Sequence, residues 1–135
     1  MIEIPLPNFD AVPGETLTRF LSDWSHLRAD GSVKHNAFLP PKTGKLSTYW
    51  ISRLPDDEIW RLGSEYVAPY RGPILARADI NSLVCYELDL GVELDGVPHP
   101  RHANIVGWDH TSTEHRLRAV KLAAKATVQP APTGA

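Results

Sequence analysis

The segment 98–108, with the sequence PHPRHANIVGW, holds the side chains whose types and spacing are best suited to chemistry. Prolines on both sides of His99 restrict the backbone there, so this histidine is predicted to be extended. Arg101 supplies a planar fork of donors that matches phosphate or carboxylate, and His102 follows it as another donor. We therefore predict an anion-binding site in which His99, Arg101 and His102 are presented by a stiff loop.

Further positive charge is expected from an earlier part of the chain. An Asp-Gly pair at positions 30 and 31 is a strong signal for a tight turn. With a two-residue turn, Arg28 would face Val33 and His26 would face His35. We predict that Arg28 and Lys34 add charge to the same pocket. Its ligand would be a phosphate-bearing small molecule, a nucleotide or RNA.

The histidines also permit catalysis without a metal ion. Cleavage of RNA next to its 2′-hydroxyl needs a base, an acid and a cation, and histidine suits the first two roles because its pKa lies near neutrality. His102 with a second histidine, His35 or His26, would form a phosphodiesterase or ribonuclease, and we take His102 and His35 as the catalytic pair. The other interpretation of the loop is a purely structural clasp, anchored by the apolar residues that follow it.

A metal site is a weaker interpretation. His99 and His102 have H-x-x-H spacing, and further ligand types follow at Asp109, His110, Glu114 and His115. Structural zinc in a small protein usually recruits cysteines, and this chain has one, Cys85. We expect neither a metal nor a cofactor. Acidic neighbours raise a thiol pKa, so Cys85 is expected to be packed rather than reactive.

The last helix offers a different kind of surface. The basic residues Arg118, Lys121 and Lys125 fall on one of its faces, so a protein-interaction subunit with an acidic partner is a third interpretation.

Phosphate-binding and hydrolase motifs are missing from the sequence. There is no G-x-x-x-x-G-K-[ST], no G-x-G-x-x-G and no G-x-S-x-G, which argues against a kinase, a Rossmann dehydrogenase or an α/β-hydrolase.

Hydrophobic periodicity predicts the elements that would position these residues. Three helices are predicted: one from Leu17 to near Ser25, one after Pro55 and one begun by Thr111. Strands are predicted over 45–54, 73–80 and 83–90, with a short buried strand within 103–108. Residues 1–14 are expected to form an extended arm, and 129–135 a flexible Pro/Ala tail. The fold class is α+β, with a small antiparallel or mixed sheet and about three helices packed against it.

Composition limits the class of protein further. The chain has 135 residues, 42% hydrophobic residues and a formal net charge of −2, which suits one globular domain over 1–135 with no global attraction to nucleic acid or anionic lipid. A single cysteine cannot form an internal disulfide, and we expect a cytoplasmic protein. No apolar stretch approaches the roughly 18 residues of a membrane span, so no membrane association is expected. The oligomeric state is left open.

Overall fold

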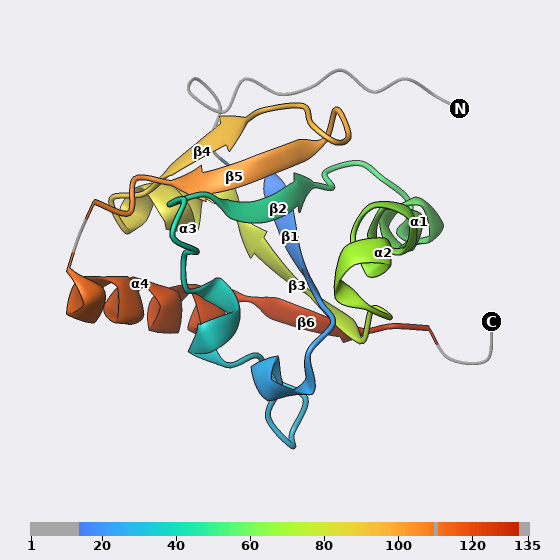
Figure 1. The fold of residues 1–135 in the computed structure, drawn as a ribbon, viewed down its shortest axis with the longest axis horizontal. Helices are drawn as coiled ribbons and strands as arrows, with labels where there is room; N and C mark the ends of the chain where they lie inside the picture. Colours follow the sequence, from blue (N-terminus) through green and yellow to red (C-terminus); the bar gives the residue numbers. More distant parts are fainter. Residues whose placement is uncertain (1–13, 110, 133–135) are drawn as a thin grey trace.

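A computed structural model describes residues 14–109 and 111–132, and within this range the chain forms a six-stranded antiparallel sheet with helices on both faces (Figure 1). The strand order is β4-β5-β2-β1-β3-β6. The strands are β1 (Thr16–Leu21), β2 (Leu46–Trp50), β3 (Ala76–Asn81), β4 (Gly91–Leu94), β5 (His102–Val106) and β6 (Thr127–Pro130). The predicted α+β class is confirmed, and the sheet is larger than the small one expected.

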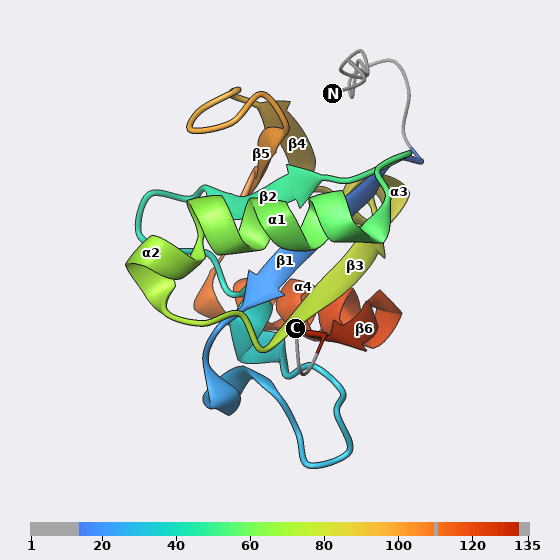
Figure 2. The ribbon, with the colours of Figure 1, turned by 90° about the vertical axis from the view of Figure 1, so that its right-hand side faces the viewer.

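Helices cover the two faces of the sheet unequally. The α-helices are α1 (Asp56–Tyr66), α2 (Ala68–Arg71), α3 (Ser82–Glu87) and α4 (Ser112–Lys125), and two 3-10 turns are η1 (Trp24–His26) and η2 (His35–Phe38). In Figure 2, α1 crosses in front of the sheet and α4 lies behind it. The larger core lies on the α4 side and includes residues of η2 and α3, whereas a smaller core lies beneath α1.

Alternation along the strands divides their side chains between the two cores. In β2, Leu46 and Trp50 belong to the larger core, while Tyr49 belongs to the smaller core under α1. Successive side chains of a strand point to opposite faces, so Ser47 shares the face of Tyr49. This face is only partly covered by helices, and it is where polar side chains gather.

Several elements agree with the sequence-based predictions. The strands predicted over 45–54 and 73–80 are β2 and β3, the helix after Pro55 is α1, and the strand within 103–108 is part of β5. The Thr111 side chain accepts a hydrogen bond from the main-chain N–H of Glu114 at 3.3 Å, which is the predicted cap of α4. The cap and the periodicity therefore identified the last helix correctly.

The helix predicted from Leu17 to near Ser25 is wrong, because this segment forms β1. Leu17 and Leu21 belong to the larger core and Phe20 to the smaller one, so apolar residues occupy both faces of the strand. β1 lies between β2 and β3 in the sheet. A strand buried on both faces carries an apolar pattern that periodicity cannot separate from a helix. Trp24 follows in η1 and is exposed.

The strand predicted over 83–90 is also wrong, because α3 occupies most of that segment. The Asn81 side chain accepts a hydrogen bond from the N–H of Leu83 at 2.9 Å and caps the helix. Cys85 is buried in the larger core. A helix of six residues is less than two turns long, which is too short for its period to stand out against the alternation in the sequence.

The two chain ends depart from the predictions in different ways. The flexible tail predicted for 129–135 is wrong at Gln129 and Pro130, which lie in β6 and pair with β3. Proline is tolerated there because β6 is an edge strand. Residues 133–135 lie outside the described residues, as do 1–13, so the arm predicted for 1–14 stays a prediction.

The Asp-Gly turn is present, but its predicted register is wrong. Leu27 pairs with Val33 in an isolated bridge, and the N–H of Gly31 donates to the carbonyl of Arg28 at 2.9 Å. The loop is therefore longer than two residues, and Arg28 does not face Val33. Among the described residues, no helix has the length and apolar character needed to cross a membrane.

Candidate functional site: a serine–histidine–aspartate cluster beside a cleft

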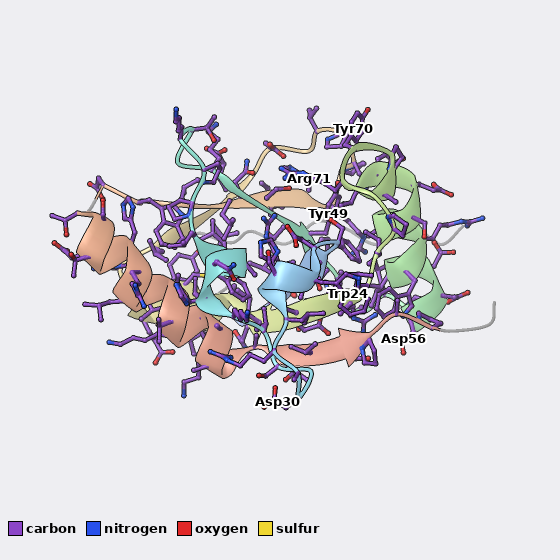
Figure 3. The ribbon with its side chains drawn as sticks, turned by 60° about the horizontal axis from the view of Figure 1, so that its bottom comes forward. Trp24, Asp30, Tyr49, Asp56, Tyr70 and Arg71 are labelled. Atoms are coloured by element: carbon purple, nitrogen blue, oxygen red, sulfur yellow. The ribbon has the colours of Figure 1, made fainter. Side chains whose placement is uncertain are left out.

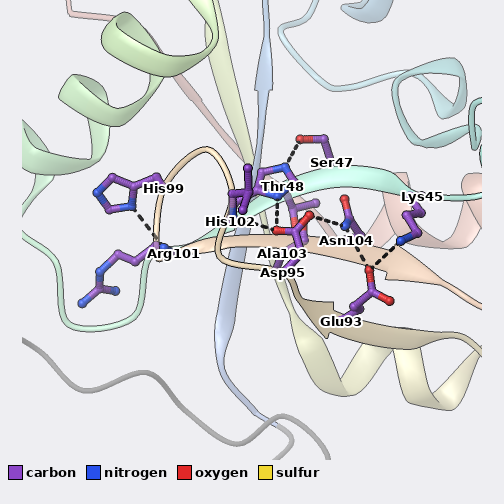
Figure 4. Close-up of polar contacts among 11 residues, drawn as sticks. Lys45, Ser47, Thr48, Glu93, Asp95, His99, Arg101, His102, Ala103 and Asn104 are labelled. Carbon is purple, nitrogen blue, oxygen red and sulfur yellow. Dashed lines mark hydrogen bonds and ion pairs between the residues drawn. The ribbon is translucent and has the colours of Figure 1, made fainter.

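Three polar side chains form a hydrogen-bonded series on the open face of the sheet (Figure 4). Ser47 Oγ lies 2.6 Å from His102 Nε2, and His102 Nδ1 lies 2.6 Å from Asp95 Oδ1. The register of β2 and β5 places Ser47 opposite Asn104 and Tyr49 opposite His102. Ser47 and His102 are therefore diagonal neighbours on one face, a distance that side chains can bridge.

Asp95 is fixed in place by groups other than His102. Asn104 Nδ2 donates to Asp95 Oδ2 at 2.9 Å, and the N–H of Val97 donates to Oδ1 at 3.3 Å. Burial opposes ionisation, but the hydrogen bonds from His102, Val97 and Asn104 together hold the pKa of Asp95 below its ordinary value. An ionised Asp95 requires a proton on Nδ1 of His102. In the neutral imidazole Nε2 is then an acceptor, and it takes a hydrogen bond from the Ser47 hydroxyl.

The series borders a cleft of about 670 Å³. The cleft lies between the sheet, η1, the end of α1 and α2, and the loop before β5. Its lining residues are Arg19, Phe20, Ser22, Asp23, Trp24, His26, Ser47, Tyr49, Tyr66, Val67, Tyr70, Arg71, Pro98 and His102. Figure 3 labels four of them, Tyr70, Arg71, Tyr49 and Trp24, in one part of the structure. Ser47 and His102 are therefore reachable from this cleft.

The charge of the cleft is positive. Burial lowers the pKa of Arg19 to about 10, with a further contribution from Arg71, so the Arg19 guanidinium keeps its charge at neutral pH. Burial lowers the pKa of His26, and Arg19 and Arg71 lower it further although Asp23 opposes them. Asp23 is the one carboxylate among the lining residues, and its Oδ1 accepts the N–H of Ser25. Two cations thus face one anion.

Aromatic side chains form much of the rim and floor. Trp24 is 72% exposed and Tyr70 is 84% exposed, although both belong to residue types that are usually much more buried. Tyr49 is buried and packs edge-on against His102, with ring centroids 5.1 Å apart. The cleft therefore combines a cationic centre with two exposed aromatic rings.

Arg101 lies away from this cleft. Its side chain is buried, with the residue 6% exposed, and the guanidinium lies 4.1 Å from the centre of the Trp50 ring. Nη1 donates to the carbonyl of Trp50 at 3.2 Å and to that of Ser52 at 3.4 Å. Arg101 does not line the cleft. These contacts favour the structural interpretation of the loop.

The remaining predicted site residues are dispersed. His99 Nδ1 accepts the N–H of Arg101 at 3.1 Å, and its ring packs against Tyr66. Arg28 donates to the carbonyl of Val33 at 2.8 Å and lines a second cavity. Lys34 precedes η2, and His35 begins it. His35, taken above as the catalytic partner of His102, does not line the cleft, where the second histidine is instead His26.

The metal-site interpretation and the protein-interaction interpretation can each be compared with the structure. Among the described residues no group of three His, Cys, Asp or Glu side chains is placed to hold a metal ion, and His110 lies outside that range. On α4, Arg118 Nε donates to the carbonyl of Leu88 at 2.7 Å, so this arginine is tied to the end of α3. Lys121 and Lys125 are exposed, and a protein partner for that face stays a prediction.

Sequence reasoning missed most of the cleft. Ser47 lies inside a predicted strand, and Asp95 was not among the predicted site residues. Arg71 sits in a four-residue helix that had no predicted counterpart. A serine, a histidine and an aspartate separated by up to 55 residues carry no spacing signal. Only strand pairing brings them together.

Comparison of the chain with protein-family models, with curated proteins and with solved structures finds no match. The chemistry of the cleft is therefore the basis on which a function can be assigned.

Proposed function

We propose that the cleft binds a phosphate-bearing ligand with an aromatic group, such as a nucleotide or the end of an RNA. The observation that carries this proposal is the charge at Arg71. This residue is exposed, and no carboxylate pairs with it among residues 14–109 and 111–132. Arg61 is different, since it pairs with Glu58 and Glu65 on α1.

Electrostatics supports an anion rather than a neutral ligand. Arg71 and Arg19 repel each other and both oppose protonation of His26. An anion placed between them would relieve this repulsion, and hydrogen bonds from charged donors are stronger than those from neutral ones. Phosphate offers acceptor oxygens to the guanidinium of Arg71. Arg19 adds positive charge, although its Nε and Nη1 already donate to the carbonyls of Ala37 and Ser47, both at 3.0 Å. The proposed anion site is therefore the cleft of Arg71, rather than the loop of Arg101 that the sequence predicted.

The exposed rings support an aromatic part of the ligand. Trp24 and Tyr70 line the same cleft as Arg71. A base that stacks on an exposed aromatic side chain gains about 1–3 kcal/mol, and this gain is independent of the base sequence. A nucleotide would use both kinds of contact. The single Cys85 rules out an internal disulfide, and we place this nucleotide-binding function in the cytoplasm.

Calorimetric titration with adenosine 5′-monophosphate tests the proposal, with adenosine and inorganic phosphate as the two fragments. The nucleotide should bind more tightly than either fragment. Arg71→Ala should weaken nucleotide binding about 10- to 100-fold, because hydrogen bonds to a charged group contribute about 1.5–3 kcal/mol. Arg61→Ala is the matched control and should bind as the wild type does. Equal affinities for the two variants would refute the proposed site.

A further inference from the structure

We propose that Ser47 is a nucleophile activated by His102 and Asp95, and that the protein hydrolyses carboxylic esters that reach Ser47 through the cleft. This activity goes beyond nucleotide binding and does not require it. The serine, histidine and aspartate are joined by two hydrogen bonds of 2.6 Å each. This is the arrangement in which a base activates a hydroxyl and a carboxylate orients the base.

The surroundings hold the base in the required tautomer. Asp95 receives hydrogen bonds from Asn104 and from the N–H of Val97, so the carboxylate that orients His102 is itself oriented. The His102 ring is also packed against Tyr49. An imidazole fixed on three sides costs little reorganisation when it accepts a proton, which is what general-base catalysis needs.

Other serines use their hydroxyls differently. Ser82 Oγ accepts the N–H groups of Gly14 and Glu15, both at 3.0 Å. Ser52 Oγ accepts the N–H of Thr16 at 2.7 Å. These hydroxyls anchor the start of β1. Ser47 Oγ instead contacts an imidazole and borders a cleft. Its surroundings therefore differ from those of Ser82 and Ser52, whose hydroxyls anchor main-chain N–H groups.

The reaction can be written with water as the co-reactant. The Ser47 hydroxyl transfers its proton to His102 Nε2 as Oγ forms a bond to the ester carbonyl carbon, and the carbonyl oxygen becomes an oxyanion. His102 then gives that proton to the departing alkoxide as the carbon–oxygen bond breaks, which leaves an acyl group on Ser47. Water repeats both steps, releases the carboxylic acid and restores Ser47.

Tyr49 is placed to assist the oxyanion. It lines the cleft directly opposite His102 in the pairing of β2 with β5. Burial raises the pKa of Tyr49 to about 12, with smaller contributions from Tyr66 and Asp95. The hydroxyl therefore keeps its proton at neutral pH and can donate a hydrogen bond. A donor aimed at a developing negative charge stabilises the transition state.

The first test is labelling with a fluorophosphonate, which reacts with activated serines and needs no knowledge of the natural substrate. The intact protein should gain one label, and peptide mapping should place it on Ser47. Ser47→Ala should not be labelled, whereas Ser64→Ala, which removes an exposed hydroxyl from α1, should be labelled as fast as the wild type. An unlabelled wild-type protein, or a label on Ser22, another serine that lines the cleft, would overturn the proposal.

The second test uses p-nitrophenyl acetate and separates positioning from structure. Asp95→Asn should lower kcat at least about 100-fold, since the histidine is left in the wrong tautomer, with KM unchanged. Labelling should slow by a similar factor. A variant that hydrolyses and labels at the wild-type rate would overturn the role of Asp95. Nucleotide affinity is measured separately by calorimetry, so failure of the esterase and failure of the binding site remain distinguishable.

Discussion

Replacing Arg101 with methionine removes a buried guanidinium while keeping an unbranched apolar side chain of similar length. The substitution takes away two hydrogen bonds, to the carbonyls of Trp50 and Ser52, and the stacking of the guanidinium on the Trp50 ring. If Arg101 is a structural clasp, its replacement should change stability. If it is the cation of an anion site, its replacement should change binding.

The geometry of these three interactions sets the expected magnitude. The hydrogen-bond lengths of 3.2 and 3.4 Å are at the long end, so about 1 kcal/mol each is appropriate. The cation–π contact, at 4.1 Å and out of water, adds about 1–2 kcal/mol. Removing the cost of a buried charge offsets part of this. Arg101→Met should therefore lower the free energy of unfolding by about 2–3 kcal/mol, a large part of the roughly 5–15 kcal/mol typical of a small protein.

Urea denaturation at pH 7 followed by circular dichroism measures this decrease. Arg53→Met is the matched control, since Arg53 also lies over the Trp50 ring, but at 5.6 Å and more open to solvent. It should cost less than about 0.5 kcal/mol, as surface substitutions usually do. Folded Arg101→Met should bind adenosine 5′-monophosphate like the wild type. Equal stability of the two variants, or a tenfold loss of nucleotide affinity in Arg101→Met, would refute the structural role.

Three further predictions concern packing and titration. In Gly63→Ala the new Cβ would lie 2.8 Å from a ring carbon of Phe20. The overpacking should cost about 1–3 kcal/mol of stability, which matches or exceeds the gain of about 1 kcal/mol from the higher helix propensity of alanine. The melting temperature should therefore not rise, and a raised melting temperature would contradict this. Burial raises the pKa of Cys85 to about 12. A disulfide reagent at pH 8 should therefore modify this thiol far more slowly in the native protein than in the unfolded protein. Rapid reaction of the native protein would show that the thiol is accessible. The pKa of Asp95 is lowered in the folded protein, so its stabilisation is complete above the unfolded value of about 3.9 and is lost as pH falls through the folded value. The stability difference between wild type and Asp95→Asn should therefore shrink as the pH falls below about 4, where Asp95 takes up a proton; a difference that grows below about pH 4 would reverse that sign.

Elements that carry strong local signals were predicted correctly from the sequence. Thr111 and Glu114 have the spacing of a helix cap, and the structure has that cap. β1 was missed because both of its faces are buried, which removes the alternation that identifies a strand. α3 was missed because a capping asparagine, Asn81, outweighs the alternation of the six residues that follow it. Periodicity therefore fails where both faces of a strand are buried and where a helix is too short for its period to show.

Sequence reasoning named two residues that line the cleft, His102 and, as the alternative to His35, His26. His102 was selected because of its stiff loop, and it does border the cleft. Its contacts with Ser47 and Asp95 depend on the register of β2 with β5 and on the turn between β4 and β5. Arg101 was chosen for its fork of donors and its stiff loop, and in the structure its guanidinium lies over the Trp50 ring. Residue type indicated the chemistry, whereas register decided which residues could use it.

The most direct test of nucleotide binding is the titration of the histidine rings by nuclear magnetic resonance, with and without adenosine 5′-monophosphate. Burial and the nearby arginines hold the pKa of His26 below its ordinary value in the free protein. A bound phosphate should raise that pKa, because an anion favours the protonated ring, and the amide of Arg71 should shift with it. An unchanged His26 pKa, with shifts confined to Lys121 and Lys125 on α4, would contradict the proposed site.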